Sequence, residues 1–335
     1  MTGLPQERDV LRQLVVDGID DEGRGRATLG HGDSAIDVAI RGALPGDVVD
    51  ARVERVFAAR GLVQAKRLGP ANGPLHVVRD CPHPGPCAAC PLHGVDDAFV
   101  AALKQQRVRQ AFADVGLDVP IAPVVDGDGV RQKVKLVAGG VAGALVLGHY
   151  APHSHVVVEA GGCAHARDDI LIAVQAVREL LDEHELGPDL VVAVIARAFA
   201  EGVAVVVVAR APCPVDIAAL WPRSIPLVDE HDVETGEHVV VTGVAWRQQA
   251  QTGSRNAIVG GEIDVVAGSV VGHALDDRQG VGAPVHVDSF CQADALGASL
   301  LVTQAVRFVL DGVAPEAPVL DLYAGTGAFA RVLHA

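Results

Sequence analysis

Aromatic residues make up only 3% of this 335-residue chain, which also has just one methionine and four lysines. No apolar run reaches the roughly 18 residues that a membrane-spanning helix needs. The opening MTGLPQERDV lacks the basic and apolar regions of a secretory signal. We therefore expect a cytoplasmic protein with no membrane partner. The length suggests two or three domains, and since half of the residues are hydrophobic the chain can bury a substantial core.

The net charge of −15 argues at first against a nucleic-acid partner. However, residues 1–163 carry 17 basic and 19 acidic residues, whereas residues 164–335 carry 10 and 23. The first half is therefore nearly neutral, and its basic groups could be either a polyanion-binding surface or ordinary solvated faces. These groups are Arg52, Arg55, Arg60, Lys66 and Arg67, then Lys104, Arg107 and Arg109, then Arg131, Lys133 and Lys135.

The pattern of apolar residues and turns predicts an α+β multidomain protein. Short strands with Gly and Asp turns predict a small five-stranded, OB-like β-barrel at the N-terminus, a fold that binds oligonucleotides or serves as a structural module. Further on, helices are expected at 96–115, 167–186 and 295–313, with strands at 130–138, 143–151 and 155–161 and a hairpin around Glu201-Gly202. We expect domains at 8–68, 75–285 and 286–335.

Three cysteines, Cys81, Cys87 and Cys90, fall in a C-x5-C-x2-C pattern within a Pro-rich loop, and Cys163 follows 73 residues later. Four thiolates suit tetrahedral zinc or an iron–sulfur cluster. Three clustered ligands and one remote ligand favour a 4Fe–4S cluster over a zinc ribbon, which has two matched pairs. The alternative is three reduced thiols and a buried core cysteine. His83, His93 and His165 are lower-ranked substitute ligands, and Cys213 and Cys291 are expected to be buried hydrophobes.

The sequence VLDLYAGTGAF at 319–329 indicates an apolar strand, a Gly-rich turn and the start of a helix. In a doubly wound sheet this is where the backbone approaches a nucleotide-like ligand. The DLxxGxG form is typical of S-adenosylmethionine-binding methyltransferases. A dinucleotide site is less well supported, because the third glycine of the G-x-G-x-x-G pattern is missing.

Together these features resemble the RNA (uracil-5-)-methyltransferase family, in particular its branch with a TRAM domain and a 4Fe–4S cluster acting on 23S ribosomal RNA. Four further segments carry the resemblance, which covers essentially the whole chain. They are ALPGDVV at 43–49, VRQKVKL at 130–136, LGHYAPHSHVVVEAGGC at 147–163 and DSFCQAD at 288–294. The resemblance implies an N-terminal TRAM barrel, a central α/β RNA-binding domain with the cluster loop, and the start of a Rossmann-like methyltransferase domain.

The resemblance also implies residue roles in an S-adenosylmethionine-dependent methylation of uridine C5 by a monomer, with ribosomal RNA favoured over tRNA. Asp294 and Ala328 stand where the family has Asn, which puts polar contacts to the cofactor in doubt. The implied cluster ligands are Cys81, Cys87, Cys90 and Cys163; the implied cofactor contacts are Gln292, Tyr323 and Gly325; and the implied substrate contacts are Phe290, Arg131 and Lys133.

The family's reaction needs a nucleophilic Cys and a Glu base, and neither D-P-P-R nor S-C-N-P occurs in the chain. We therefore assign no catalytic residue within it, expect the nucleophile and base beyond residue 335, and expect the chain alone to be inactive. Two alternatives stay open. One is a non-catalytic RNA-binding iron–sulfur protein, and the other is a zinc-stapled structural domain.

Overall fold

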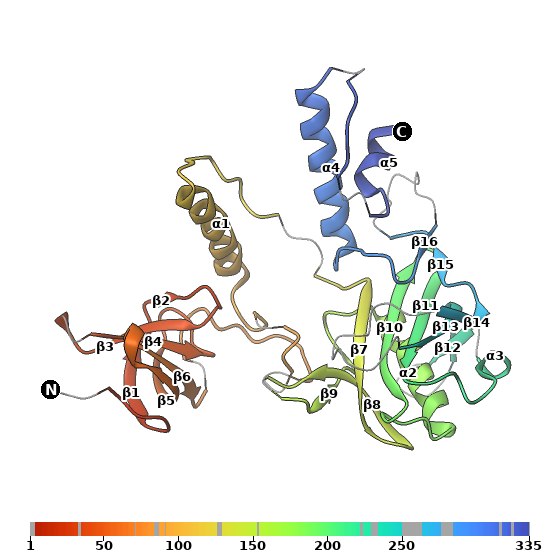
Figure 1. The fold of residues 1–335 in the computed structure, drawn as a ribbon, viewed down its shortest axis with the longest axis horizontal. Helices are drawn as coiled ribbons and strands as arrows, with labels where there is room; N and C mark the ends of the chain where they lie inside the picture. Colours follow the sequence, from red (N-terminus) through yellow and green to blue (C-terminus); the bar gives the residue numbers. More distant parts are fainter. Residues whose placement is uncertain are drawn as a thin grey trace. The chain divides into compact units, whose positions relative to one another are not determined.

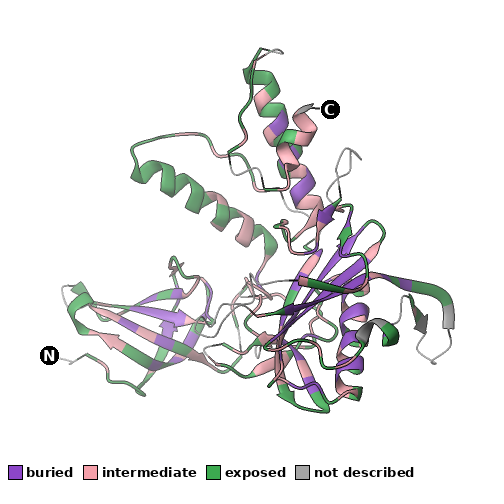
Figure 2. Cartoon of the chain, turned by 45° about the vertical axis from the view of Figure 1, so that its right-hand side comes forward, coloured by how far each residue is buried: buried purple, intermediate pink, exposed green. Residues whose placement is uncertain are grey.

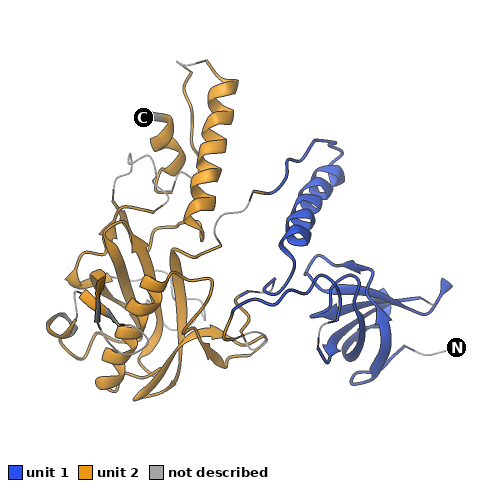
Figure 3. Cartoon of the chain, turned by 180° about the vertical axis from the view of Figure 1, so that it is seen from behind, with its two compact units in different colours: residues 1–80, 90–124 blue, residues 81–89, 125–335 orange. Residues whose placement is uncertain are grey.

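The structure is a computed structural model in which the chain divides into two compact units (Figure 3). One unit contains residues 1–80 and 90–124, and the other contains residues 81–89 and 125–335. The description covers residues 4–334 except 33–34, 71, 84–86, 91, 126–128, 153, 222–223, 229–233, 250–262, 276–283, 315–316 and 323–324.

The first unit is built on a six-stranded sheet that surrounds one hydrophobic core (Figure 1). Alternating residues such as Val49, Ala51 and Val53 are buried, which is the period-two pattern of a half-exposed strand. The strands predicted in 10–68 are therefore confirmed, although they number six where five were expected. They are β1 (Val10–Val15), β2 (Gly18–Ile19), β3 (Gly25–Leu29), β4 (Ile36–Arg41), β5 (Val48–Phe57) and β6 (Leu62–Leu68), ordered β1-β5-β6-β4-β3-β2.

Asp47 is a fully buried carboxylate that ties the turn of ALPGDVV to a later part of the same unit. Its Oδ2 accepts a hydrogen bond from the Leu44 amide at 2.9 Å, and Nε2 of His76 lies 3.0 and 2.9 Å from its two oxygens. An added Cβ at Gly73 would stand 2.1 Å from Asp47 Oδ1, so this close approach requires glycine. The turn is thus fixed by polar contacts as well as by the core.

Helix α1 (Asp97–Asp114) matches the helix predicted at 96–115. Asp96 caps it, since its side chain accepts from the Phe99 amide at 2.8 Å. None of its residues is buried, and its apolar residues Val108 and Phe112 are exposed (Figure 2).

The second unit is built on an eight-stranded sheet whose centre is the predicted hairpin around Glu201-Gly202. The order is β12-β13-β11-β10-β7-β8-β9, with β14 also paired to β13, and β11 and β13 are parallel. The strands are β7 (Lys133–Val141), β8 (Ala144–Tyr150), β9 (Val157–Glu159), β10 (Val191–Phe199), β11 (Gly202–Ala209), β12 (Ser224–Val228), β13 (Glu234–Gln248) and β14 (Ile263–Gly268).

The two faces of this sheet are covered differently. Helix α2 (Asp168–Glu183), predicted at 167–186, packs its apolar residues on one face and forms the main core. On the other face a smaller core contains Ile195, Val206, Val270, Val285 and Val287. This second covering layer includes the short pair β15 (Val271–Gly272) and β16 (Val285–His286). A short helix, α3, spans Ile217–Leu220.

Helix α4 (Ala295–Gly312) matches the helix predicted at 295–313 and contacts α5 (Ala328–His334). Among the described helices, α4 is long and apolar enough to cross a membrane by length and composition, although no membrane-spanning run was expected. Core helices of water-exposed proteins pass the same test, and α4 buries Ala298, Val302 and Val306.

The apolar strand indicated at about 318–323 was expected to be exposed or frayed without neighbouring strands. The described part, 318–322, forms no strand, and Val319, Leu320 and Leu322 are exposed, which agrees with that expectation. A strand of a parallel sheet is stable only when neighbours pair its backbone groups and cover both its faces. The described residues offer this segment no such partner strand.

Replacing Asp47 by Ala should loosen the first unit, because the buried Leu44 amide and His76 both lose their acceptor. A buried donor without a partner costs about 1–3 kcal/mol. Hydrogen exchange of the β4, β5 and β6 amides should therefore accelerate. His76→Ala is the control with the smaller effect, since it leaves the Leu44 bond intact. Native-like exchange in Asp47→Ala would refute the role of this carboxylate.

Candidate functional site

The candidate site is built on residues 286–294, which lead from β16 to the N-terminus of α4 on the second face of the larger sheet. Val285 and Val287 are buried in the smaller core and anchor the start of the segment. Phe290, by contrast, is 75% exposed, and Gln292 is exposed as well. The start of the segment is therefore anchored in the core, whereas the side chains of Phe290 and Gln292 are exposed to solvent.

Three strands of the sheet direct cationic side chains at this segment. Lys133 on β7 donates to the Ser289 carbonyl at 3.1 Å. Arg197 on β10 donates from Nη1 to the carbonyls of His286 and Ser289, each at 3.2 Å. Arg247 on β13 forms an ion pair with Asp288. The carbonyl dipoles and one carboxylate of the segment thus offset the positive charge of the sheet.

These cations perturb their neighbours. Arg197 and Arg247 are each 1% exposed, and Lys133 lies directly opposite Arg197 in the β7–β10 register. Burial, and then the positive charges of Arg197 and Arg247, lower the pKa of Lys133, while Cys291 opposes the shift. Burial and the same cations lower the pKa of His286. The guanidinium of Arg197 also stacks over Phe199, 5.0 Å from the ring centroid.

The structure brings the two predicted motifs VRQKVKL and DSFCQAD together. The fully buried Gln132 donates from Nε2 to the Gln292 carbonyl at 3.0 Å, and its backbone amide donates to Ala293 at 2.8 Å. Arg131 forms a backbone bridge with Asp294, and its side chain donates to the Ala89 carbonyl at 3.4 Å. The substrate-binding roles of Arg131, Lys133 and Phe290 stay predictions.

Asp294 uses both carboxylate oxygens within the protein. Oδ1 caps α4 by accepting from the Gly297 amide at 2.7 Å, and Oδ2 accepts from the Gly129 amide at 2.6 Å. This explains how an aspartate serves at a position where the family has Asn, because a carboxylate accepts at both atoms whereas an amide accepts at one.

Of the implied cofactor contacts in the C-terminal turn, Tyr323 lies outside the described residues. Gly325 and Gly327 have positive φ values of 58° and 74°, a conformation that glycine adopts without strain. The turn then leads into α5. The cofactor roles of Gln292, Tyr323 and Gly325 stay predictions.

The cysteine loop lies against the segment that ends at Cys163. His83 Nε2 is 3.1 Å from the Gly161 carbonyl, and the Ala88 amide donates to Tyr150 at 3.2 Å. A Cβ at Gly162 would stand 3.3 Å from Pro82. This contact is flanked in sequence by Cys81 and Cys163. Nearby, burial and the charge of Arg131 lower the pKa of His149.

All six cysteines are half-buried. Cys90 belongs to the first unit, where its carbonyl accepts from the His93 amide at 3.0 Å. Among the described residues, no three His, Cys, Asp or Glu side chains gather in a metal-binding group. The ligand set stays a prediction. Cys213 and Cys291 were expected to be buried hydrophobes, but both are only half-buried. Cys213 packs against the main core, and its Sγ donates to the Val215 carbonyl at 3.1 Å.

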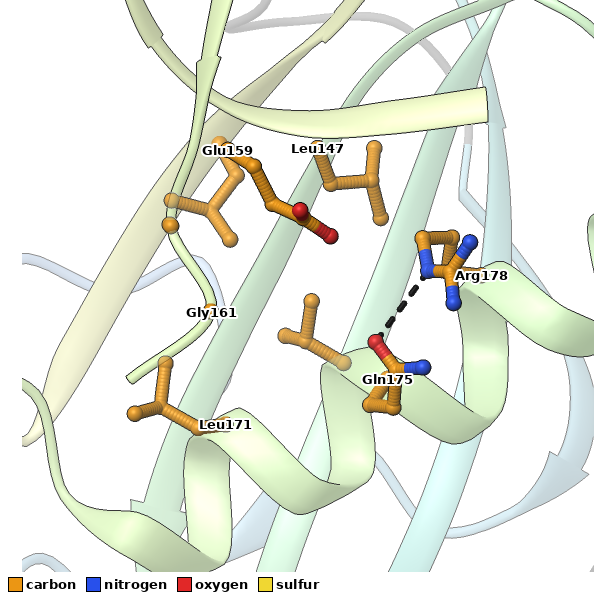
Figure 4. A pocket seen from close by; sticks show the side chains of 9 residues that line it. Leu147, Glu159, Gly161, Leu171, Gln175 and Arg178 are labelled. Carbon is orange, nitrogen blue, oxygen red and sulfur yellow. Dashed lines mark hydrogen bonds between the residues drawn. The ribbon is translucent and has the colours of Figure 1, made fainter. Parts of the chain in front are cut away.

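A small pocket next to residues 159–161 opens between β8, β9 and α2 (Figure 4). Leu136, Leu147, Leu171 and Val174 line it, and Glu159, Gln175 and Arg178 supply its polar groups. Gln175 accepts from Arg178 Nε at 3.1 Å, as the dashed line in Figure 4 marks. Of its polar lining residues, Glu159 and Gln175 are exposed, and Arg178 is half-buried.

The first unit carries a row of basic residues across neighbouring strands. Lys66 on β6 lies opposite Arg52 on β5 and opposite Arg41 on β4. Arg41 pairs with Glu54, and the other two lie on the exposed face. Like charges placed directly opposite each other destabilise a sheet.

Sequence reasoning missed the buried Gln132, Arg197 and Arg247. A signal was present for Arg197, since it interrupts the otherwise apolar strand VVAVIARAF. A charge in a buried strand must have compensating partners. Gln132 lies within the quoted segment VRQKVKL, but nothing in the sequence indicated its burial, because a glutamine before a strand is ordinary at the surface.

No protein-family model matches the chain, but it is similar to curated RNA methyltransferases. It is 25% identical over 328 residues to 23S rRNA (uracil(1939)-C(5))-methyltransferase RlmD of Bordetella avium, covering 94% of this chain and 62% of that protein. The RlmD of Azoarcus sp. is 28% identical over 242 residues, covering 63% and 55%. That of Halomonas elongata is 28% identical over 178 residues, covering 52% and 36%.

A solved structure shares the fold. The tRNA (uracil-54, C5)-methyltransferase of Pyrococcus abyssi, in complex with S-adenosyl-L-homocysteine, aligns with a TM-score of 0.64 and 18% identity, over 95% of this chain and 69% of that one. The chain is therefore similar in sequence and fold to RNA uracil-C5 methyltransferases. These comparisons confirm the resemblance of the chain to the RNA (uracil-5-)-methyltransferase family. The chain spans between about a third and three-fifths of the length of these curated relatives.

Two substitutions of Asp294 should separate its two bonds. Asp294→Ala removes the cap of α4, which costs about 0.5–2 kcal/mol, and frees the Gly129 amide. Asp294→Asn keeps one acceptor for the cap but not a second one for Gly129. Hydrogen exchange at Gly297–Ser299 should therefore rise only in the Ala variant, and exchange at Gly129 should rise in both. Equal exchange in the two variants would contradict this assignment.

Proposed function

We propose that this chain belongs to an S-adenosylmethionine-dependent enzyme that methylates C5 of a uridine in RNA, with 23S ribosomal RNA as the substrate. The observation that carries the proposal is the alignment with an RlmD protein over 94% of the chain. The fold shared with a tRNA uracil-C5 methyltransferase supports the same chemistry. We propose that it acts as a cytoplasmic monomer.

In this proposal the six-stranded sheet, residues 8–68, is the TRAM-like barrel, residues 75–285 form the central RNA-binding domain, and residues 286–335 begin the methyltransferase domain. Gln292, Tyr323 and Gly325 contact S-adenosylmethionine. The exposed ring of Phe290 stacks near the target base, with Arg131 and Lys133 on the substrate side. No residue of this chain is assigned as the nucleophile or as the general base.

We also propose that Cys81, Cys87, Cys90 and Cys163 hold a 4Fe–4S cluster. The donor set fits, because four cysteine thiolates are the ligands of such clusters and each of these cysteines is half-buried. The contact between Pro82 and Gly162 supports a common site for Cys81 and Cys163. When bound, the cluster would cross-link the loop at 81–90 to the segment ending at Cys163.

RNA contact is supported by the row of Arg41, Lys66 and Arg52. Their mutual repulsion in the free protein would be relieved by a phosphate backbone. The net charge of −15 does not by itself exclude this, because phosphate contacts are local and exposed charges more than about 10 Å apart interact weakly at 0.1 M salt.

Binding and methyl transfer to unmodified RNA test the function. The chain should bind a 23S rRNA fragment containing U1939 more tightly than a tRNA or an unrelated RNA. It should form no 5-methyluridine from labelled S-adenosylmethionine by itself. RNA binding with no affinity for S-adenosylmethionine would favour the non-catalytic RNA-binding protein. Methylation by the chain would support the function. It would also show that the chain contains the nucleophile, for which Cys291 would be the candidate.

The double variant Arg52→Glu, Lys66→Glu should weaken this binding. If each cation contacts one phosphate, the slope of log affinity against log salt should fall by about 0.7–0.9 per lost contact. Arg60→Glu, at the end of the turn η2 (Ala58–Arg60), is the matched control off the row. An equal loss in the control would exclude a specific role for the row.

Metal analysis tests the cluster. Protein purified anaerobically should contain about four iron atoms per chain, and Cys163→Ser should lose them. Cys213→Ser should keep the iron, because Cys213 packs against the main core. Zinc in place of iron would favour the zinc-stapled domain, and a metal-free protein would refute the cluster.

A further inference from the structure

The segment 286–293 forms little regular structure, yet its carbonyl oxygens are held along its length. Those of His286 and Ser289 accept from Arg197, and that of Ser289 also accepts from Lys133. Those of Gln292 and Ala293 accept from the side chain and the backbone of Gln132. The donors come from the β7 and β10 region of the sheet, which is anchored independently by the main core.

Two side chains of the segment, by contrast, are exposed. Because Phe290 and Gln292 are exposed, packing of these side chains does not fix the backbone conformation from which they project. The backbone bonds beneath them are therefore what sets their positions. A contact group must be held within a fraction of an ångström to be effective, and buried hydrogen-bonding groups behind it provide that precision.

Gln132 is the member of this set that is hardest to explain by stability. It is fully buried, and among the described residues its Oε1 has no hydrogen-bond partner. A buried polar atom without a partner is costly. An apolar side chain of similar size would avoid that cost. The presence of glutamine here is explained by its amide nitrogen, Nε2, which donates a hydrogen bond to the Gln292 carbonyl.

We infer that Gln132 is a positioning residue for Gln292, and that Gln132, Lys133 and Arg197 together form a clamp that holds the 286–293 backbone in one conformation before any ligand binds. That Gln292 then meets S-adenosylmethionine rests on the proposed function. The clamp itself does not, because it follows from the contacts of the free protein.

The test uses the full chain and the variant Gln132→Leu, which keeps the volume but cannot donate to Gln292. Loss of one net hydrogen bond should raise the exchange of the 290–293 amides about 2- to 10-fold. Iodoacetamide should likewise alkylate Cys291 several-fold faster, as read from its peptide by mass spectrometry. Cys213 serves as the internal reference in the same sample, and its rate should not change.

The melting temperature separates positioning from a structural role. Because Gln132→Leu also removes a buried unsatisfied oxygen, the melting temperature should stay close to that of the parent. Gln175→Leu is the matched control, since Gln175 lies on α2 and, in the part of the chain that the structure describes, bonds to its helix neighbours Glu179 and Arg178. Faster exchange throughout the sheet with a lower melting temperature would overturn the inference, as would an unchanged Cys291 rate.

A second variant guards against a Gln132→Leu protein that fails to fold. Lys133→Met keeps the unbranched stem and removes only the donor to Ser289, so exchange should rise around Ser289 more than at Ala293. Uniform exchange along the segment would count against the clamp. A chain that shows these local responses but binds neither rRNA nor S-adenosylmethionine would refute the proposed function and leave the clamp intact.

Discussion

The burial of the β10–β11 hairpin on both faces is the constraint from which the second unit is built. Every residue of β11 after Gly202 is buried, and β10 is nearly as enclosed. A strand pair of this kind cannot leave either side to water, because burial of its valines supplies the driving force for folding. Helix α2 covers one side, and the layer containing β15, β16 and Val287 covers the other. The segment 286–294 therefore lies on the face of the sheet opposite α2, where its first residues help to cover the apolar strands.

That second cover explains the charges within the sheet. Arg197 and Arg247 lie in strands that are otherwise apolar, and a buried charge is destabilising unless its donors are satisfied. The segment that covers them supplies carbonyl oxygens and Asp288. The cations and the segment depend on each other, since exposure of either without its partner would be unfavourable. A covering layer of apolar residues alone would bury the same area but would not fix the backbone conformation of the segment.

Local patterns were enough to predict the helices at 97–114, 168–183 and 295–312 and the hairpin at Glu201-Gly202. Each has a signal that survives without tertiary context, such as the Asp96 cap or a valine-rich run with a Gly turn. The apolar run at 318–322 forms no strand, as expected of a parallel-sheet strand without neighbours to pair its backbone and cover its faces. The motif residues Phe290 and Gln292 were found by resemblance. Gln132 was not, because its role is defined only by what lies across the fold from it.

Asp294 shows how the same physics accommodates a departure from the family pattern. At this position one side chain caps the N-terminus of α4 and also links residues 288–294 to Gly129, which directly precedes VRQKVKL. A carboxylate does both through separate oxygens, toward Gly297 and Gly129. The negative charge is also favourable at a helix N-terminus, where the dipole is positive. The departure thus strengthens the link between the two motifs, while the outward presentation of Phe290 and Gln292 depends on the backbone bonds from Gln132, Lys133 and Arg197.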